Sequence, residues 1–135
     1  MNGENFFEVE GKFPSLNEYT RACRAHWSKG AKMKQENERL ACWYIQQAKL
    51  NGTLENVDGP VVIHFEWREK TRRRDPDNVY FAKKFVLDAM QRMGVLPNDN
   101  QKYIVGLYST ISIADEYGVK VTIIPQNTLD TMTDK

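Results

Sequence analysis

Apolar residues recur with two different periods along this chain, and the periods predict where strands and helices form. Four stretches alternate between apolar and polar side chains, which is the pattern of a strand with one buried face. They span Phe6 to Phe13, Val61 to Trp67, Val105 to Ile113 and Val119 to Ile124. Each of the four is therefore expected to turn one face towards a core.

A first helical region follows the turn Pro14-Ser15-Leu16-Asn17, which can cap a helix, and it is expected to begin near Asn17. Gly30 is expected to break this region, because the apolar pattern changes phase there. Apolar residues then recur at helical spacing up to the stop signal Asn51-Gly52. The pattern predicts a short leading segment and one main amphipathic helix.

A second helix is predicted between Asp77 and Gly94, where apolar residues follow the i, i+3, i+4, i+7 pattern until the glycine stops it. Asp75 or Asp77 can cap its first turn. The loop Leu96-Pro97-Asn98-Asp99-Asn100 then leads into the third strand. Asp115-Glu116-Tyr117-Gly118 is interpreted as the turn of a hairpin between the last two strands.

The order β-α-β-α-β-β predicts an α+β fold in which a mixed sheet of about four strands packs with two main helices. A length of 135 residues favours a single domain. This domain is expected to span residues 1–125, and the polar, unpatterned residues 126–135 are expected to form a disordered tail.

The composition is that of an ordinary globular protein, with 41% apolar and 27% charged residues. No apolar stretch approaches the ~20 residues that a membrane-spanning helix needs, so no membrane association is expected. The first residues, Met1-Asn2-Gly3-Glu4-Asn5, lack the basic and apolar regions of a secretory signal. Cys23 and Cys42 show no metal-ligand spacing, which favours free thiols in a reducing, cytoplasmic compartment.

The formal net charge is only +1, so any case for nucleic acid rests on how the charges are distributed. Between Glu18 and Glu36 the chain has basic residues and no acidic ones, and a second basic block precedes the aspartates at positions 75 and 77. The first set is Arg21, Arg24, Lys29, Lys32 and Lys34, and the second is Lys70, Arg72, Arg73 and Arg74. These two sets are the candidate phosphate contacts.

The run Arg72-Arg73-Arg74-Asp75-Pro76-Asp77-Asn78 joins the second basic block to two aspartates. Arginines bind phosphate and carboxylates bind divalent metals, so this run indicates chemistry on a phosphodiester. From Asp77, positions 81, 84 and 88 share one helical stripe, which directs Lys84 and Asp88 the same way as the aspartate. An ordinary surface pair of Lys84 and Asp88 explains their spacing without any chemistry.

Five segments carry a resemblance to a known family, in the order in which that family has them. They are Pro14-Ser15-Leu16-Asn17-Glu18-Tyr19, Arg73-Arg74-Asp75-Pro76-Asp77-Asn78, Lys83-Lys84-Phe85-Val86-Leu87-Asp88-Ala89, Gly94-Val95 and Asn98-Asp99. Together they resemble the RusA family of Holliday junction resolvases. The resemblance implies a homodimeric endodeoxyribonuclease with an α+β fold. It also implies Mg²⁺ or Mn²⁺, two ions per site, and paired nicks in branched DNA (a four-way junction) during recombination and repair.

Carried over by position, the resemblance implies that Asp75, Asp77 and Asp99 bind the metal and that Lys84 completes the catalytic set. The family's lysine follows the second aspartate by four residues, and Phe81 holds that position here. Assigning the role to Lys84 therefore requires an insertion of three residues.

Two further positions near this set stay open. Lys83 is an alternative to Lys84, and Asp88 is a possible accessory residue. Asn98-Asp99-Asn100 stands where many members have paired acids, which leaves one carboxylate before the third strand and predicts a lower local affinity for metal.

The residues expected to contact DNA are Asn17, Arg21, Arg24, Lys32, Arg72, Arg73 and Arg74. Of these, Arg74 is expected to be the best placed for phosphate. None of the three tryptophans is assigned to DNA, because Trp43 and Trp67 fall at core-facing spacings and Trp27 has no distinguishing pattern.

Three other functions remain open. Asp58, Glu66 and Arg68 approximate the Asp and Glu-x-Lys set of restriction-type nucleases, but the lysine is absent. A non-catalytic DNA-binding module would use the aspartates as helix caps and would bind DNA independently of magnesium. A general structure-selective nuclease would use the same site without preferring the four-way junction.

Overall fold

The computed structural model of this chain describes residues 4–126 and contains four strands and four helices. The elements are β1 Asn5–Glu10, α1 Leu16–Ala25, α2 Trp27–Asn51, β2 Val61–Glu69, α3 Pro76–Tyr80, α4 Lys83–Arg92, β3 Ile104–Ile113 and β4 Gly118–Pro125. The expected single-domain α+β architecture is confirmed, with each expected helical region divided in two. The tail expected at 126–135 lies outside the described residues, apart from Gln126.

The four strands form one mixed sheet in the order β1-β4-β2-β3. β2 and β3 are parallel, whereas β4 runs antiparallel to both β1 and β2. The expected hairpin between the last two strands is therefore wrong, because β2 lies between them. Insertion of β4 between two strands buries Val119, Val121 and Ile123, whose side chains would be only partly covered at an edge.

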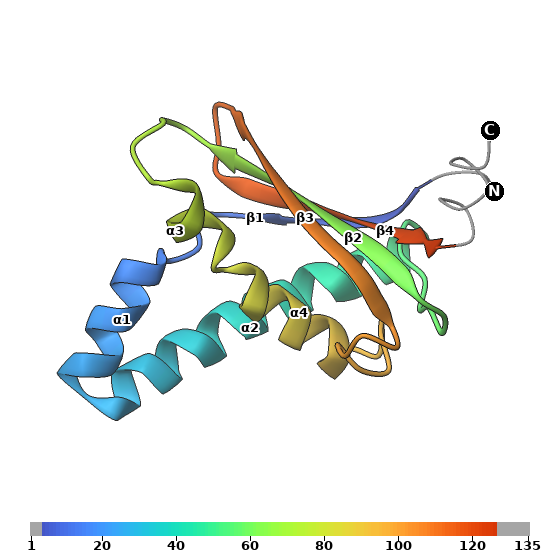
Figure 1. Ribbon diagram of the computed structural model, residues 1–135, viewed down its shortest axis with the longest axis horizontal. Helices are drawn as coiled ribbons and strands as arrows, with labels where there is room; N and C mark the ends of the chain where they lie inside the picture. The colour runs from blue at the N-terminus through green and yellow to red at the C-terminus, as the bar shows by residue number, and fades with distance from the viewer. Residues whose placement is uncertain (1–3, 127–135) are drawn as a thin grey trace.

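The helices gather on one side of the sheet, as Figure 1 shows, and the core lies between the two layers. β2 illustrates the division: Val61, Ile63, Phe65 and Trp67 are buried towards the helices, and the residues between them are only half-buried. The alternation that predicted this strand thus separates a helix-covered face from an open face. α2 packs against β1 and α4, and α4 supplies buried side chains such as Phe85.

The break between α1 and α2 lies at His26, whose backbone is extended (φ −170°, ψ 138°), and not at Gly30 as the sequence suggested. Gly30 sits inside α2 and is buried. A Cβ built at this position would lie 2.4 Å from Cys23 Sγ and 3.3 Å from Cys23 Cα. Gly30 is needed for close packing of α1 on α2, which is a role that sequence periodicity does not reveal.

The helix expected from Asp77 to Gly94 is divided into α3 and α4 by a tight turn at Phe81 and Ala82. Backbone hydrogen bonds of the i to i−3 type join the two parts, from Ala82 to Val79 (3.3 Å) and from Lys84 to Phe81 (3.2 Å). The rings of Phe81 and Phe85 both pack against Tyr19 of α1, with centroid distances of 5.2 and 5.7 Å. The turn therefore lies where the aromatic contacts join this region to α1.

Within residues 4–126, no helix is long and apolar enough to cross a membrane. Cys23 and Cys42 are both free thiols, as their spacing predicted. Burial raises the pKa of the Cys42 thiol, which keeps it in the unreactive protonated form.

Candidate functional site

The loop between β2 and α3 is anchored by a buried ion pair. Glu69, the last residue of β2, accepts two hydrogen bonds from Arg74, with Nε–Oε1 at 3.0 Å and Nη2–Oε2 at 2.6 Å. Arg74 Nη1 also donates to the carbonyl oxygen of Phe13 at 2.9 Å. The hydrogen bonds to Glu69 are the main reason why the pKa of Arg74 is raised, so its charge is fixed.

This geometry corrects the expectation that Arg74 is the arginine best placed for phosphate. Its guanidinium is committed to Glu69 and to the backbone that precedes α1. Arg72 and Arg73 are exposed, and neither forms an ion pair with any residue that the structure describes. These two arginines are the cations of the loop that remain available to an anionic ligand.

Asp75 and Asp77 follow directly and are both exposed. Asp75 is the N-cap residue of α3, yet its side chain makes no capping hydrogen bond. Asn78 fixes the other end of the segment, because its Oδ1 accepts a hydrogen bond from the backbone N–H of Asn17 at 3.0 Å. The Asp-Pro-Asp segment is thus held on both sides while its carboxylates face solvent.

Lys84, Asp88 and Asp99 lie around one hollow of about 320 Å³, which Phe81, Lys83 and Leu87 complete. Phe81, Lys84 and Asp88 therefore share one side of the helical segment, as their spacing predicted, but Asp77, where the predicted stripe begins, does not line this hollow. Asp88 also forms an ion pair with Lys34 of α2 at 3.6 Å, which partly neutralises it. No pattern in the sequence indicated this last contact.

The loop around Asp99 explains the two asparagines that flank it. Asn98 Oδ1 accepts a hydrogen bond from the backbone N–H of Asn100 at 3.1 Å, and Asn100 Oδ1 accepts one from the backbone N–H of Lys102 at 3.0 Å. Both amides therefore shape the turn. Asp99 takes no part in these bonds, and its residue borders the hollow beside Lys84.

The expected metal set is only partly assembled. Asp75 and Asp77 do not line the hollow that contains Asp99. No group of three or more His, Cys, Asp or Glu side chains in the described part of the chain is close enough to hold a metal. Asp75 and Asp77 alone suit Mg²⁺, which commonly binds through one or two carboxylates and completes its six-coordinate shell with waters and substrate phosphates.

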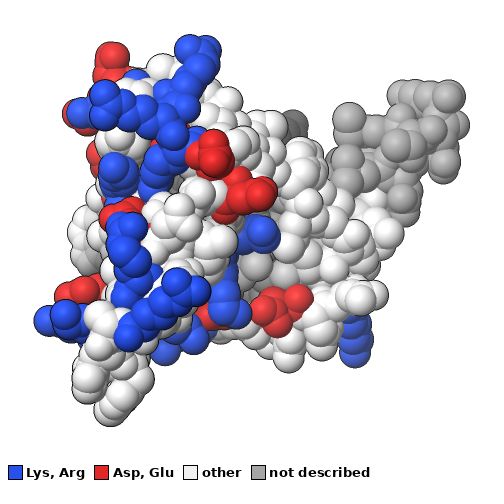
Figure 2. Space-filling view, turned by 60° about the vertical axis from the view of Figure 1, so that its left-hand side comes forward, with Lys and Arg blue, Asp and Glu red and all other residues white. Residues whose placement is uncertain are grey.

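Basic side chains gather on the side of the molecule that carries α1 and the start of α2, and Figure 2 shows them running down that face among a few acidic residues. Arg21, Arg24, Lys29 and Lys32 are all exposed there. Four of the five basic residues between Glu18 and Glu36 are therefore exposed on α1 and the start of α2.

Trp27 is the aromatic residue of this surface that sequence reasoning missed. It begins α2, is 78% exposed and stacks on His26 with ring centroids 5.7 Å apart. Trp67 is buried as expected, but the expected burial of Trp43 is wrong, because 57% of that residue is exposed. The signal that could have separated Trp27 from a core tryptophan is its position at the junction of α1 and α2, with basic residues on both sides in the sequence.

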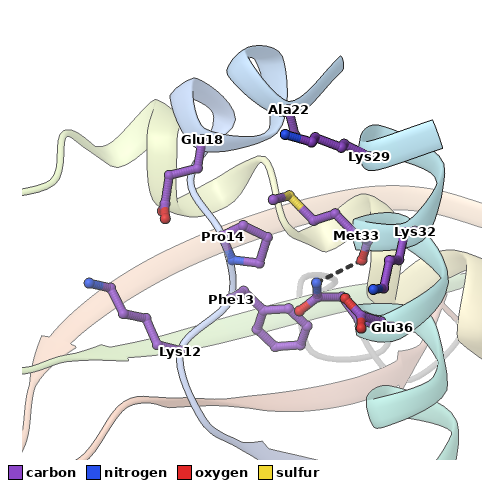
Figure 3. A pocket seen from close by; sticks show the side chains of 10 residues that line it. Lys12, Phe13, Pro14, Glu18, Ala22, Lys29, Lys32, Met33 and Glu36 are labelled. Carbon is purple, nitrogen blue, oxygen red and sulfur yellow. Dashed lines mark hydrogen bonds between the residues drawn. The ribbon is translucent and has the colours of Figure 1, made fainter. Parts of the chain in front are cut away.

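A second hollow, of about 470 Å³, opens between α1, α2 and the chain that follows β1. Lys12, Lys29 and Lys32 line it together with Glu18 and Glu36, as Figure 3 shows. The pKa of Glu18 is lowered, chiefly by the hydrogen bond from the backbone N–H of Ser15 (2.9 Å) in the capping box of α1. The hollow is therefore continuous with the basic surface of α1 and α2, but its lining contains carboxylates as well as lysines.

Comparison with protein-family models gives no match for this chain, and neither does comparison with curated proteins.

Proposed function

We propose that this chain is a divalent-metal-dependent endodeoxyribonuclease of the RusA type, which resolves four-way DNA junctions by paired nicks in recombination and repair. The observation that carries the proposal is the pair Asp75 and Asp77, fixed between two anchors with both carboxylates unpartnered among the described residues. In a purely structural role as a cap, the Asp75 carboxylate would accept a hydrogen bond from a backbone N–H in the first turn of α3, and none is present.

Different residues of the chain have different roles in such a site. Asp75 and Asp77 hold the metal ion, and the exposed Arg72 and Arg73 bind the phosphates that flank the cleaved bond. When bound, the metal supplies charge stabilisation at the phosphoryl oxygens and a more acidic water. Lys84 adds positive charge from the next helix, where it borders the same hollow as Asp88 and Asp99.

The spacing between Asp77 and Lys84 follows from the divided helix. Asp77 accepts the backbone N–H of Phe81 through its carbonyl oxygen (3.2 Å), and Phe81 accepts that of Lys84 in the same way (3.2 Å). A two-residue turn at Phe81 and Ala82 separates α3 from α4 within this spacing. Lys84 and Asp88 both lie on α4, where their i, i+4 spacing puts them on one side of the helix.

The proposal is tested by incubating the protein with a synthetic four-way junction and with a linear duplex of the same sequence, in Mg²⁺, Mn²⁺ or EDTA. We expect metal-dependent nicks in opposing strands of the junction and little cleavage of the duplex. Asp75→Asn and Asp77→Asn should abolish cleavage and spare junction binding. Asp58→Asn, which changes an exposed aspartate in the loop before β2, at the opposite end of that strand from Asp75 and Asp77, serves as the matched control.

Cleavage that persists in Asp77→Asn, or that needs no metal, would contradict the assigned role. Equal cleavage of both substrates would favour the general structure-selective nuclease.

A non-catalytic DNA-binding module is the second candidate, and the exposed basic side chains of α1 and the start of α2 favour it. Such a module would bind the junction equally in Mg²⁺ and in EDTA and would cut neither substrate. The same incubation, read by gel mobility in place of product, distinguishes it from the nuclease.

A further inference from the structure

Trp27 lies at the corner where α1 meets α2, and Figure 1 shows that this corner extends away from the sheet. At 78% it is the most exposed of the large hydrophobic residues that the structure describes. Aromatic side chains stabilise a fold through the area that they bury, and Trp27 leaves most of its area in water. The stability of the fold therefore does not explain a tryptophan at this position.

The indole of Trp27 is held by its neighbours. His26 Nδ1 accepts a hydrogen bond from the backbone N–H of Ser28 (3.2 Å) and lies 2.6 Å from Ser28 Oγ, which fixes the imidazole. The imidazole stacks on the indole at an interplanar angle of 30°. Among the described residues, the indole thus has one supporting ring and is otherwise open to solvent. A ring held in this way loses little conformational entropy when a second flat ring packs on it.

Four exposed cations flank this corner, two on each helix. They are Arg21 and Arg24 of α1 and Lys29 and Lys32 of α2. The i, i+3 spacing within each pair places its two side chains on one side of the helix. None of the four forms an ion pair with any residue that the structure describes. Their charge is therefore available to a polyanionic ligand.

An open aromatic ring among unpaired cations matches the chemistry of a nucleic acid strand whose bases are unpaired. Such a base stacks on an aromatic side chain while the phosphates on either side of it bind cations. In a duplex both faces of each base are covered by its neighbours, so an intact duplex offers no base to the indole. We propose that the corner of α1 and α2 binds an unpaired base of DNA, which stacks on Trp27 while the four cations bind the flanking phosphates.

This site rests on the proposed function in one respect, the choice of DNA as the polyanion. It adds a preference for unpaired bases, which phosphate contacts alone do not provide. In a branched DNA, the bases at the branch point or at a nick are the ones that can leave the stack and reach the indole.

A membrane surface is the other ligand that combines tryptophan with basic residues. A helix that binds a membrane needs an apolar face several residues wide. The residues on either side of Trp27 are exposed Arg24, Ala25, His26, Ser28 and Lys29, of which only the alanine is apolar. The surroundings of the indole therefore favour a base over a lipid.

Trp43 shows that exposure alone does not define the site. It is 57% exposed in the middle of α2, where it packs edge-on against Tyr44 with ring centroids 4.9 Å apart. The hollow beside it contains Glu8, and no lysine or arginine is among the described residues that line it. That hollow offers no cation to a phosphate, so Trp43 provides the matched control.

The test is fluorescence anisotropy in EDTA, so that no cleavage occurs, with a labelled oligodeoxythymidylate and an abasic oligomer of the same length. We expect the wild-type protein to bind the oligodeoxythymidylate more tightly. Trp27→Ala should raise its dissociation constant by about tenfold or more, which is the usual range for loss of one stacked base, and should leave the abasic oligomer unaffected. Trp27→Phe should retain most of the affinity, and Trp43→Ala should change neither dissociation constant.

Equal affinity of the wild-type protein and Trp27→Ala for the oligodeoxythymidylate would overturn the inference. Equal affinity of the wild-type protein for the two oligomers would overturn it as well. Vesicles of phosphatidylserine and phosphatidylcholine test the other ligand. If Trp27→Ala loses binding to the vesicles and keeps binding to the oligodeoxythymidylate, the site belongs to a membrane surface and the inference is wrong.

The salt dependence of binding separates stacking from phosphate contacts. Stacking releases no counterions, so Trp27→Ala should leave the slope of log affinity against log salt unchanged. Arg24→Gln should reduce that slope by about 0.7 for one lost contact to a single strand. A reduced slope in Trp27→Ala would mean that the substitution displaced the cations, and it would contradict the stacking role.

Failure of this site and failure of the proposed nuclease give different results, because binding in EDTA does not use the metal site. A chain that selects the oligodeoxythymidylate through Trp27 but cuts no junction would refute only the nuclease. A metal-dependent nuclease that binds both oligomers equally would refute only the stacking site.

Discussion

Lys83 and Lys84 are neighbours on α4, and both border the hollow that contains Asp99. They differ in exposure, because Lys84 is exposed and Lys83 is half-buried against the helix layer. Lys84 also shares its side of the helix with Asp88 at i, i+4. At the scale of single residues, these differences favour Lys84 as the residue that reaches a phosphate.

We predict that Lys84→Ala lowers the single-turnover rate of junction cleavage by about 10²–10³-fold, the usual effect of losing one positioned charge or donor. Junction affinity should change little, because in the proposed site the flanking phosphates are bound by Arg72 and Arg73. Lys83→Ala should retain most of the activity. A larger loss in Lys83→Ala than in Lys84→Ala would reverse the assignment.

The hairpin of α1 and α2 shows how one residue sets the geometry of two elements. α1 has no fully buried residue, and its contact with α2 depends on the space that Gly30 leaves for Cys23. An alanine inside a helix is favoured over glycine by about 1 kcal/mol when nothing opposes it. Here the added Cβ would meet the sulfur of the neighbouring helix.

We predict that Gly30→Ala lowers the free energy of unfolding by about 1–2 kcal/mol, although alanine has the higher helix propensity. The reason is that forcing the alanine Cβ against Cys23 costs more than the helix propensity of alanine contributes. Urea unfolding followed by circular dichroism measures the change. Gly59→Ala is the control, since a Cβ there meets nothing within 4 Å. Cys23→Ala combined with Gly30→Ala should recover part of the loss, and a stabilised Gly30→Ala protein would disprove the packing role.

Over the whole molecule, the charge is nearly balanced at +1 while the basic residues gather on one face. With this distribution of charge, the proposed binding of DNA would use a local surface, and each phosphate contact would add to the salt dependence of binding. Among the three arginines of the loop, the ion pair with Glu69 removes Arg74 from that set.

We predict that Arg72→Gln and Arg73→Gln each reduce the slope of log affinity against log salt by about one, measured on a four-way junction in EDTA. Lys120→Gln is the control, because Lys120 lies on β4 and is paired with Glu4 at 2.7 Å. An unchanged slope in both arginine variants would place the DNA on another face of the protein.

The sequence alone indicated the residues that anchor each element. Alternation located the strands, the turn Pro14-Ser15-Leu16-Asn17 and the stop Asn51-Gly52 marked the ends of the first helical region, and the i, i+4 spacing placed Lys84 with Asp88. These features depend on contacts within a few residues, which local pattern records directly. The boundaries that it missed, at His26 and at Phe81, arise where α1 meets its neighbours.

Only the tertiary structure decided the order of the strands and the partners of the charged residues. Insertion of β4 between β1 and β2, the pairing of Glu69 with Arg74 and the approach of Asp99 to Lys84 join parts of the chain through the fold. The separation of Asp75 and Asp77 from Asp99 is also a result of the tertiary fold. Periodicity determines which face of a helix or strand is buried. The free energy of burying that face does not depend on which other apolar face packs against it. The packing of the whole chain therefore decides which elements become neighbours.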